Sequence, residues 1–458
     1  MPTALIKNVK SASVYVMLNH FSSQFIRLLS NLILTRLLAP ELFGVMAFVF
    51  TIIMALHMVS DLGVKQAVVR SHNANNQKFL NVAWTIKLIH DSVIGIILIL
   101  LGLILGFTQV GISNLESALA HPDLPYVLMI ISLSQFFSGL TSIRVIDYFR
   151  RMKQKELLVL ELVSQVFSLL LMVLLAYLYS NIYALVIGSI SASFIKMIIS
   201  YTYLVGVKSS LCFDKNYIKE IVTFGKWIVL SSITGFVVNA GDKILLGFWV
   251  SASLLGFYSI AQILAQFIKQ LVQKLMSSIY FPLLSDEVRK DSDIVIIEKL
   301  YYAIRFKIDL ICCLSVGFIF ASADLIVSIL YDDRYSEVAN ILKILAFSTI
   351  WVGGQLATQL FLAFGKSKLF SHVVMYQAFV FITITPLFYY LFGFYGVVIS
   401  VVINPMVQYA FTCYYMSKYY FFDYIKEMRG LLFIPIGMLL GFLFSEFVFF
   451  MTSNLGLK

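Results

Sequence analysis

Apolar residues recur along the chain in stretches long enough to cross a lipid bilayer as helices, with polar residues between them. A helix needs about 20 apolar residues to span the hydrocarbon core. The sequence holds two sets of six such spans and an additional apolar stretch at 430–451. The runs are continuously apolar, whereas strands of a membrane barrel alternate, so the pattern predicts an all-α polytopic membrane protein. The predicted spans are 14–38, 43–63, 80–107, 124–145, 157–179, 182–206, 223–249, 254–281, 304–325, 338–364, 369–392 and 395–416.

The loop at 208–226 holds the most polar stretch in the middle of the chain and separates two halves of six spans. We expect an N-terminal six-helix lobe at 1–210, a C-terminal six-helix lobe at 211–418 and an extra transmembrane segment at 419–458. The sequences around Gly44 and Gly256 align, and each glycine is expected at a tight turn where it relieves backbone strain. An even number of spans per half predicts a pseudo-two-fold axis along the membrane normal, with a site between the lobes.

Composition supports a membrane protein and explains the basic charge. The chain has 458 residues, of which 60% are hydrophobic and 13% charged, against about 25% charged in soluble domains. The formal charge of +10 is concentrated in alternate loops, such as the one with Arg150, Arg151 and Lys153, while the loop at 108–123 has no Lys or Arg. This pattern places the N-terminus in the cytoplasm and indicates contact with membrane lipids, not nucleic acid. No cleaved signal peptide is recognisable, so we expect Met1 to be retained.

Two predicted spans carry a ladder of polar residues at steps of four, three and four, which places them on one helical face. The ladder of the first span is His20, Gln24, Arg27 and Asn31, and that of the eighth is Gln262, Gln266, Lys269 and Gln273. A cation inside the bilayer costs roughly 2.5 to 3.5 kcal/mol on insertion scales. We therefore expect both ladders to line a wet cavity, with the two cations as its main binding groups.

Other charged residues also lie inside predicted spans. Lys87 and Asp91 either form an intrahelical ion pair or line the cavity, and Lys243 is a further cavity candidate. Glu161 and Lys196 lie near predicted cytoplasmic ends, where long side chains reach the interface. The candidate coupling residues are Asp61, His57, Asp91 and Asp242. His57 and Asp61 are four residues apart and either form a proton-sensitive pair or, for Asp61, cap the end of the span.

The sequence contains no recognisable catalytic or metal site. The four cysteines are scattered without C-x-x-C spacing and are expected to be packing residues. There is no convincing P-loop, zinc-ligand cluster or nucleophile elbow. We therefore expect neither an enzyme nor a protein with a cofactor.

Two short motifs, one in each half, carry a family resemblance. The run 34–44, LTRLLAPELFG, is followed by Asp61-Leu62-Gly63, and the run 242–247, DKILLG, is followed by LGFYSIA at 255–261. These motifs resemble the openings of the two lobes in O-antigen and capsule-type polysaccharide-exporting flippases of the multidrug/oligosaccharidyl-lipid/polysaccharide exporter superfamily. Such proteins usually have 12 or 14 spans, so the single extra stretch at 430–451 is a departure.

The resemblance implies a V-shaped pair of lobes that export a polyprenyl-pyrophosphate-linked oligosaccharide across the bacterial cytoplasmic (inner) membrane for surface polysaccharide biosynthesis. It also implies a cavity formed by the first, second, seventh and eighth spans. Cations there would bind the pyrophosphate and amides would bind the sugars, with a glycan polymerase as a candidate partner. The cations are Arg27, Lys269, Lys87 and Lys243, and the amides are Gln24, Asn31, Gln262 and Gln266.

Three alternatives remain open at this point. A multidrug antiporter of the same superfamily would favour an anionic cavity, whereas the ladders carry cations. A membrane-embedded glycolipid polymerase or ligase would need a sizeable extracytoplasmic loop, and no loop between the predicted spans looks long enough. A non-transporting scaffold would have no use for two cationic stripes.

Overall fold

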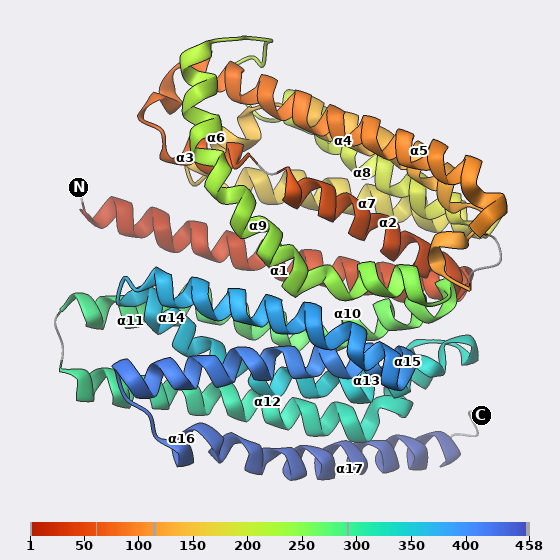
Figure 1. Ribbon diagram of the computed structural model, residues 1–458, viewed down its shortest axis with the longest axis vertical. Helices are drawn as coiled ribbons and strands as arrows, with labels where there is room; N and C mark the ends of the chain where they lie inside the picture. The colour runs from red at the N-terminus through yellow and green to blue at the C-terminus, as the bar shows by residue number, and fades with distance from the viewer. Residues whose placement is uncertain (1, 61, 113–115, 291–292, 455–458) are drawn as a thin grey trace. The chain divides into compact units, whose positions relative to one another are not determined.

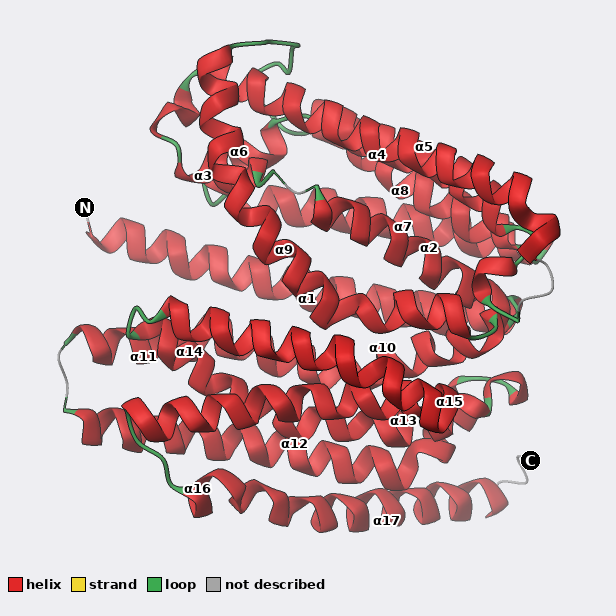
Figure 2. Cartoon of the chain, viewed as in Figure 1, coloured by secondary structure: helices red, strands yellow, loops and turns green. Residues whose placement is uncertain are grey.

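The computed structural model describes residues 2–60, 62–112, 116–290 and 293–454. These residues form helices joined by short connections, with no strand among them (Figure 2). Of the helices in these ranges, 9 are long and apolar enough to cross a membrane, or 10 if the bent pair Leu124–Leu140 and Arg144–Arg150 is one span. The predicted all-α, multi-pass membrane fold is therefore confirmed.

The first six predicted spans fall mainly on six helices (Figure 1), although the span predicted at 124–145 runs past residue 140 across a bend of 58°. These are α1 (Pro2–Leu37), α2 (Pro40–Val59), α4 (Gln77–Ile112), α5 (Leu124–Leu140), α7 (Gln154–Tyr179) and α8 (Ile182–Thr202). Short helices connect them: α3 (Val64–Arg70), η1 (His72–Asn75), η2 (Ala118–Ala120) and α6 (Arg144–Arg150). Gly63 adopts a left-handed φ of 59° just before α3, which glycine does without steric cost.

The second half contains the remaining spans. Its helices are α9 (Lys215–Trp249), α10 (Ala252–Leu275), the π-helical η3 (Met276–Tyr280), α11 (Phe281–Arg289), α12 (Ile294–Leu330), η4 (Asp333–Tyr335), α13 (Glu337–Ala346), η5 (Phe347–Gly354), α14 (Gln355–Ala363), α15 (Ser367–Tyr419), α16 (Tyr424–Met428), η6 (Arg429–Leu432) and α17 (Phe433–Asn454). The helix α15 breaks at Gly393, where φ is 60° and ψ is −142°. This break falls between the two spans predicted at 369–392 and 395–416.

The chain divides into two compact helical units. The first consists of Met1–Phe236 and Lys243–Gly256, and the second of Val237–Asp242 and Phe257–Lys458. The helix α9 therefore contributes to both units. The lobe boundaries after residues 210 and 418 remain predictions.

Small residues let helices approach closely within each unit. In the first unit α4 packs along α5, and a Cβ on Gly102 would lie 2.7 Å from the carbonyl oxygen of Pro125. In the second unit α12 packs along α17, where a Cβ on Gly317 would lie 2.1 Å from the carbonyl oxygen of Ile434. Membrane helices commonly associate through such small-residue contacts. The extra C-terminal helix is thus tightly packed into the second unit.

The two aligned glycines do not relieve backbone strain. Gly44 lies within α2 and Gly256 within α10, and neither has a positive φ. Each instead lies against the backbone of the other helix, in contacts that belong to the first unit. The expected reason for these glycines was wrong. A side chain is excluded because the two helices lie too close together, not because the chain turns here.

Candidate functional site

A polar cluster lies among α2, α4 and α5 of the first unit. Lys87 and Asp91 are one turn apart on α4, and the Lys87 ammonium lies 3.0 Å from Asp91 Oδ2. Ser138 on α5 donates to the same carboxylate oxygen at 3.0 Å, and its carbonyl accepts a hydrogen bond from Lys87. Asp91 is buried, with 4% of its surface exposed. The sequence left two roles open for Lys87 and Asp91, and the ion pair is the one that the geometry contains.

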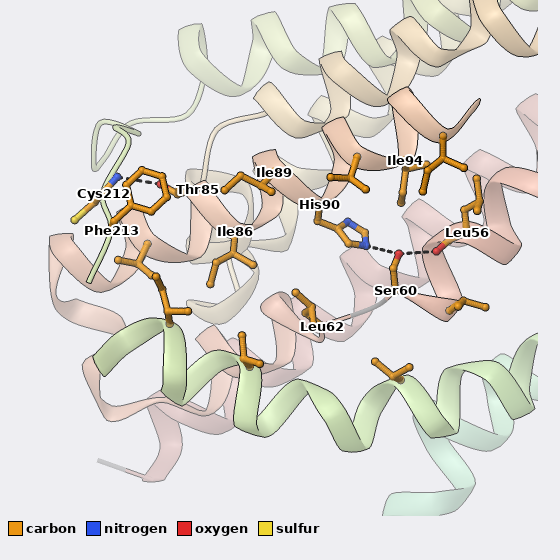
Figure 3. Close-up of a pocket in the computed structure, with 17 residues that line it drawn as sticks. Leu56, Ser60, Leu62, Thr85, Ile86, Ile89, His90, Ile94, Cys212 and Phe213 are labelled. Carbon is orange, nitrogen blue, oxygen red and sulfur yellow. Dashed lines mark hydrogen bonds between the residues drawn. The ribbon is translucent and has the colours of Figure 1, made fainter. Parts of the chain in front are cut away.

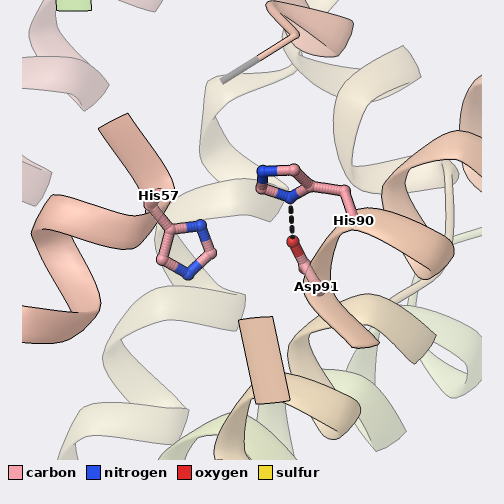
Figure 4. A group of neighbouring side chains, drawn as sticks. All are labelled: His57, His90 and Asp91. Atoms are coloured by element: carbon pink, nitrogen blue, oxygen red, sulfur yellow. Dashed lines mark hydrogen bonds and ion pairs between the residues drawn. The ribbon is translucent and has the colours of Figure 1, made fainter. Parts of the chain in front are cut away.

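Two histidines complete the cluster (Figure 4). His90 Nδ1 lies 2.8 Å from Asp91 Oδ1, and the ring of His57 on α2 lies 5.6 Å from that of His90. His57 Nε2 is 2.7 Å from Gln135 Oε1 on α5. His57 thus lies beside a histidine and an aspartate of another helix. Asp61, its predicted partner, lies outside the described residues.

The hydrogen bonds around His90 are compatible with two protonation states of its ring, which differ by one proton on Nε2. Ser60 Oγ lies 2.6 Å from the carbonyl oxygen of Leu56 and 2.8 Å from His90 Nε2 (Figure 3). A hydroxyl has one proton. When Ser60 donates it to Leu56, His90 Nε2 must be protonated, and the bond between His90 and Asp91 needs a second proton. When Ser60 donates to Nε2 instead, one proton on Nδ1 satisfies both histidine contacts. Rotation of the Ser60 hydroxyl therefore lets the same hydrogen bonds fit a His90 ring with either one or two protons.

The same cluster has three atoms of metal-ligating type. The ligand atoms of His57, His90 and Asp91 lie within 4.8 Å of one another. Each is already engaged, since His57 contacts Gln135, His90 contacts Asp91, and Asp91 holds the Lys87 ammonium. A metal ion would have to displace that ammonium or approach it closely. The arrangement is therefore better suited to a proton than to a metal ion.

An apolar cavity of about 570 Å³ lies next to this cluster, between α2, α4 and α9 (Figure 3). Branched aliphatic side chains form most of its wall, among them Ile86, Ile89 and Ile94. His90 and Ser60 are two of its few polar lining residues. The side of the cluster that bears His90 and Ser60 thus faces an apolar space.

The first ladder meets further charged residues on α7 and α8. Arg27 is exposed on α1 and interacts electrostatically with Glu161 of α7. Glu161 forms an ion pair with Lys196 of α8 at 2.7 Å. Gln165 Nε2 donates to both Glu161 at 3.2 Å and Ser23 of α1 at 3.1 Å. Glu161 and Lys196, expected only to reach the membrane interface, are thus part of a polar group beside Arg27.

The other members of the first ladder differ in exposure. Gln24 is half-buried, whereas Asn31 is buried and its carbonyl accepts a hydrogen bond from Thr35 at 2.9 Å. Lys65 on the short helix α3 adds a cation near Lys196. Desolvation lowers the pKa of Lys65, and the positive charge of Lys196 lowers it further.

The second ladder separates into a buried end and a half-buried middle. Gln262 is buried and donates to Asp242 Oδ2 at 2.9 Å, and Tyr258 donates to the same oxygen. Lys269 is half-buried and interacts electrostatically with Asp242. Gln266 accepts a hydrogen bond from Gln270 at 3.2 Å. The structure therefore connects two predicted site residues, Lys269 and Gln262, through the carboxylate of Asp242, which was expected only as a coupling residue.

The polar chain continues beyond the ladder in the second unit. Gln273 Nε2 donates to Gln355 Oε1 at 2.8 Å, and Gln355 Nε2 lies 3.4 Å from Gln408 Oε1. Lys243, the remaining cavity candidate, is half-buried on α9 within the first unit.

Sequence reasoning missed a second group of buried charges. Arg305 Nε on α12 donates to Asp309 Oδ2 at 2.7 Å, and its Nη1 lies 3.4 Å from Glu427 Oε2 on α16. Glu427 also accepts from Tyr301 and Tyr409, each at 3.0 Å. The i, i+4 spacing of Arg305 and Asp309 was a usable signal, whereas nothing in the sequence joins Glu427 to them. This group holds α16, the short helix before α17, against α12.

Solved structures share this fold at low sequence identity. The chain is similar to the inward closed conformation of the lipid II flippase MurJ, with a TM-score of 0.69, 15% identity, and coverage of 96% of this chain and 99% of that one. It is also similar to an inward-facing multidrug resistance MATE family transporter of the MOP superfamily, with a TM-score of 0.64, 13% identity, and coverage of 90% and 95%. The chain therefore has the same multi-pass helical fold as these two transporters.

Sequence comparison identifies the family within that class. The model of the family described as "polysaccharide biosynthesis protein" matches residues 33–340, and the chain belongs to this family. The predicted resemblance to polysaccharide exporters is thereby confirmed. A curated relative is the succinoglycan biosynthesis transport protein ExoT of Rhizobium meliloti, 23% identical over 284 residues that cover 61% of this chain. The match spans about half, 54%, of that relative's length.

Proposed function

We propose that this protein is a flippase that moves a polyprenyl-pyrophosphate-linked oligosaccharide from the cytoplasmic to the outer leaflet for surface polysaccharide biosynthesis. Family membership is consistent with the pathway, and the transporter fold is consistent with the step. The observation that carries the proposal is the placement of Arg27 and Lys269 at matching ladder positions on α1 and α10, at the first and eighth predicted spans. The protein acts as a transporter and not as an enzyme.

In this proposal the cations bind the pyrophosphate and the amides bind the sugars. Arg27 is exposed on α1 and interacts with Glu161, and Lys196 forms an ion pair with the same carboxylate. Lys65 lies near Lys196 and adds further positive charge. A guanidinium makes paired hydrogen bonds to phosphate oxygens, and an ammonium supplies a point charge. Lys269 and Lys243 are the other proposed cations, together with Lys87, which is paired with Asp91 but keeps 24% of its side chain exposed. Gln24, Asn31, Gln262 and Gln266 supply donors and acceptors for the glycan.

We assign proton coupling to the cluster of His57, His90 and Asp91. Its hydrogen bonds accommodate two protonation states, which a proton-driven transporter requires. Asp242 is a second coupling candidate, through its contacts with Tyr258 and Gln262. An inside-negative potential already favours outward movement of an anion, by about 2.3 kcal/mol per charge per 100 mV. Proton exchange then serves mainly to reset the empty, cationic protein.

The same proposal fixes location and partners. The protein lies in the bacterial inner membrane with its N-terminus in the cytoplasm, as the basic loops predict. Its lipid-linked substrate keeps its polyprenyl tail in the bilayer, and a glycan polymerase on the outer side receives the product. The competing function is that of a multidrug antiporter with this fold. Such an antiporter would favour an anionic cavity, whereas the two ladders carry Arg27 and Lys269.

Substitution of the ladder cations tests the proposal in cells that depend on this protein for surface glycan. Arg27→Ala should abolish export and Lys269→Ala should impair it, with lipid-linked precursor accumulating on the cytoplasmic leaflet at normal protein levels. Arg27→Lys should restore export only in part, because lysine lacks the planar fork. Lys274→Ala is the matched control, since it lies on α10 about 140° away from Lys269. Normal export by Arg27→Ala and Lys269→Ala, singly and combined, would refute the cationic-cavity mechanism.

A further inference from the structure

The two halves of α15 form a groove of about 750 Å³ between them. It lies where the first half begins and the second half ends, near residues 368 and 419. Lys368 and His372 line it from the first half, and Lys418 lines it from the second. Aromatic rings form most of the remaining wall, and none of the described residues lining the groove is acidic. The groove is therefore cationic and aromatic, unlike the apolar cavity of the first unit.

The aromatic wall is ordered by stacking. Tyr376 and Phe411 stack with ring centres 4.7 Å apart and planes 14° apart, which joins the two halves of α15. Lys418 Nζ lies 5.4 Å from the ring centre of Tyr419 and 5.8 Å from that of Tyr414. Among the described residues no acidic side chain forms an ion pair with Lys368 or Lys418. Both ammonium groups are exposed and remain available to an anion.

Exposed apolar side chains on the first half of α15 form an apolar strip next to the groove. Met375, Phe379 and Ile382 follow on the first half of α15 with 60%, 68% and 54% of their surfaces exposed. Such side chains on a membrane-spanning helix suit contact with lipid tails. Tyrosines and lysines at the end of the helix suit the depth of lipid head groups. The basic loops place this end of α15 in the cytoplasm, where the leaflet surface is negatively charged.

We propose that this groove binds the phosphate head group of an anionic phospholipid, with the acyl chains lying along the apolar strip. Lys368 and Lys418 flank the phosphate, His372 donates a hydrogen bond to it, and the tyrosines pack against the glycerol backbone. The site lies within the second unit and involves none of the ladder residues. It is thus a lipid-binding site separate from the export function proposed above, and it does not depend on that function.

Lipid titration of the purified full-length protein in detergent tests this site. The probes are dioleoylphosphatidylglycerol and, as the zwitterionic reference, dioleoylphosphatidylcholine, with binding read by native mass spectrometry. Each lysine near an anionic surface contributes a factor of about five in affinity, so Lys368→Gln with Lys418→Gln should weaken phosphatidylglycerol binding about 25-fold. Phosphatidylcholine binding should not change. Arginine at both positions should preserve phosphatidylglycerol binding, because it keeps the charge.

The matched control is Lys299→Gln with Lys366→Gln, which removes two exposed positive charges of the same unit outside the groove. It should change phosphatidylglycerol affinity by less than about twofold. An unchanged thermal midpoint without lipid will show that the variants are folded. Equal affinity of the wild type for the two lipids, or wild-type affinity in the Lys368/Lys418 variant, would overturn the proposal. Binding of polyprenyl pyrophosphate without binding of phosphatidylglycerol would also overturn it and assign the groove to the exported substrate.

Discussion

Gly44 of α2 and Gly256 of α10 lie backbone against backbone. A Cβ on Gly44 would be 1.7 Å from the carbonyl oxygen of Ala252, and one on Gly256 would be 2.0 Å from that of Pro40. These are also the two positions that align between the halves of the sequence. Equivalent glycines of the two repeats therefore contact each other. The backbone of each helix occupies the place that a side chain on the other glycine would need.

We expect alanine at Gly256 to destabilise the protein, because the backbone atoms that it would meet cannot move away as a side chain could. Overpacking typically costs about 1 to 3 kcal/mol. Gly235 is the matched control, since a Cβ there has no heavy atom within 4 Å and alanine favours helix. Thermal unfolding in detergent should show a lower midpoint for Gly256→Ala and an unchanged or higher one for Gly235→Ala. Equal midpoints would mean that the helices separate at little cost.

A second prediction concerns the proton-holding cluster. His90→Gln should leave the protein folded but remove the dependence of glycan export on an imposed pH gradient, because glutamine cannot take up a proton between Ser60 and Asp91. Export into proteoliposomes at several pH gradients measures this. His72→Gln, at an exposed histidine on η1, should behave like the wild type. A pH response that persists in His90→Gln would move the coupling site elsewhere, with Asp242 as the next residue to test.

Most of the spans could be predicted from the sequence because they depend on local hydrophobicity, and even the break in α15 falls where two predicted spans meet. The Lys87 and Asp91 pair was also readable, since one turn of helix determines it. The contact of His90 with Ser60 could not be read, because it depends on how α2 and α4 pack. The apolar stretch at 430–451 was likewise recognised as an extra helix from its hydrophobicity, whereas the role of Glu427 was missed because it depends on packing against α12.

A third prediction tests how that extra segment is held. Glu427→Ala should strongly destabilise the protein, because it leaves Tyr301, Tyr409 and one side of the Arg305 guanidinium without their acceptor. Breaking a buried ion pair by removing one partner costs about 3 to 5 kcal/mol. The amount of folded protein in membranes and its thermal midpoint measure the effect. Glu446→Ala on α17 is the control, because Glu446 is exposed. A neutral Glu427→Ala would mean that helix packing alone holds the segment.

The fourth prediction concerns topology, which in our interpretation is determined by the alternation of loops rich in Lys and Arg with loops that have few or none. Thr108 near the end of α4 and Lys153 before α7 are both exposed and belong to the same unit. In a background without native cysteines, Thr108→Cys should react with an impermeant maleimide in intact cells, and Lys153→Cys only after permeabilisation. Arg150, Arg151 and Lys153 would then face the cytoplasm, where the positive-inside rule places them. Equal labelling of both positions in intact cells would contradict the topology. Such a result would also contradict the cytoplasmic location of the proposed lipid groove, because that location was inferred from the same rule.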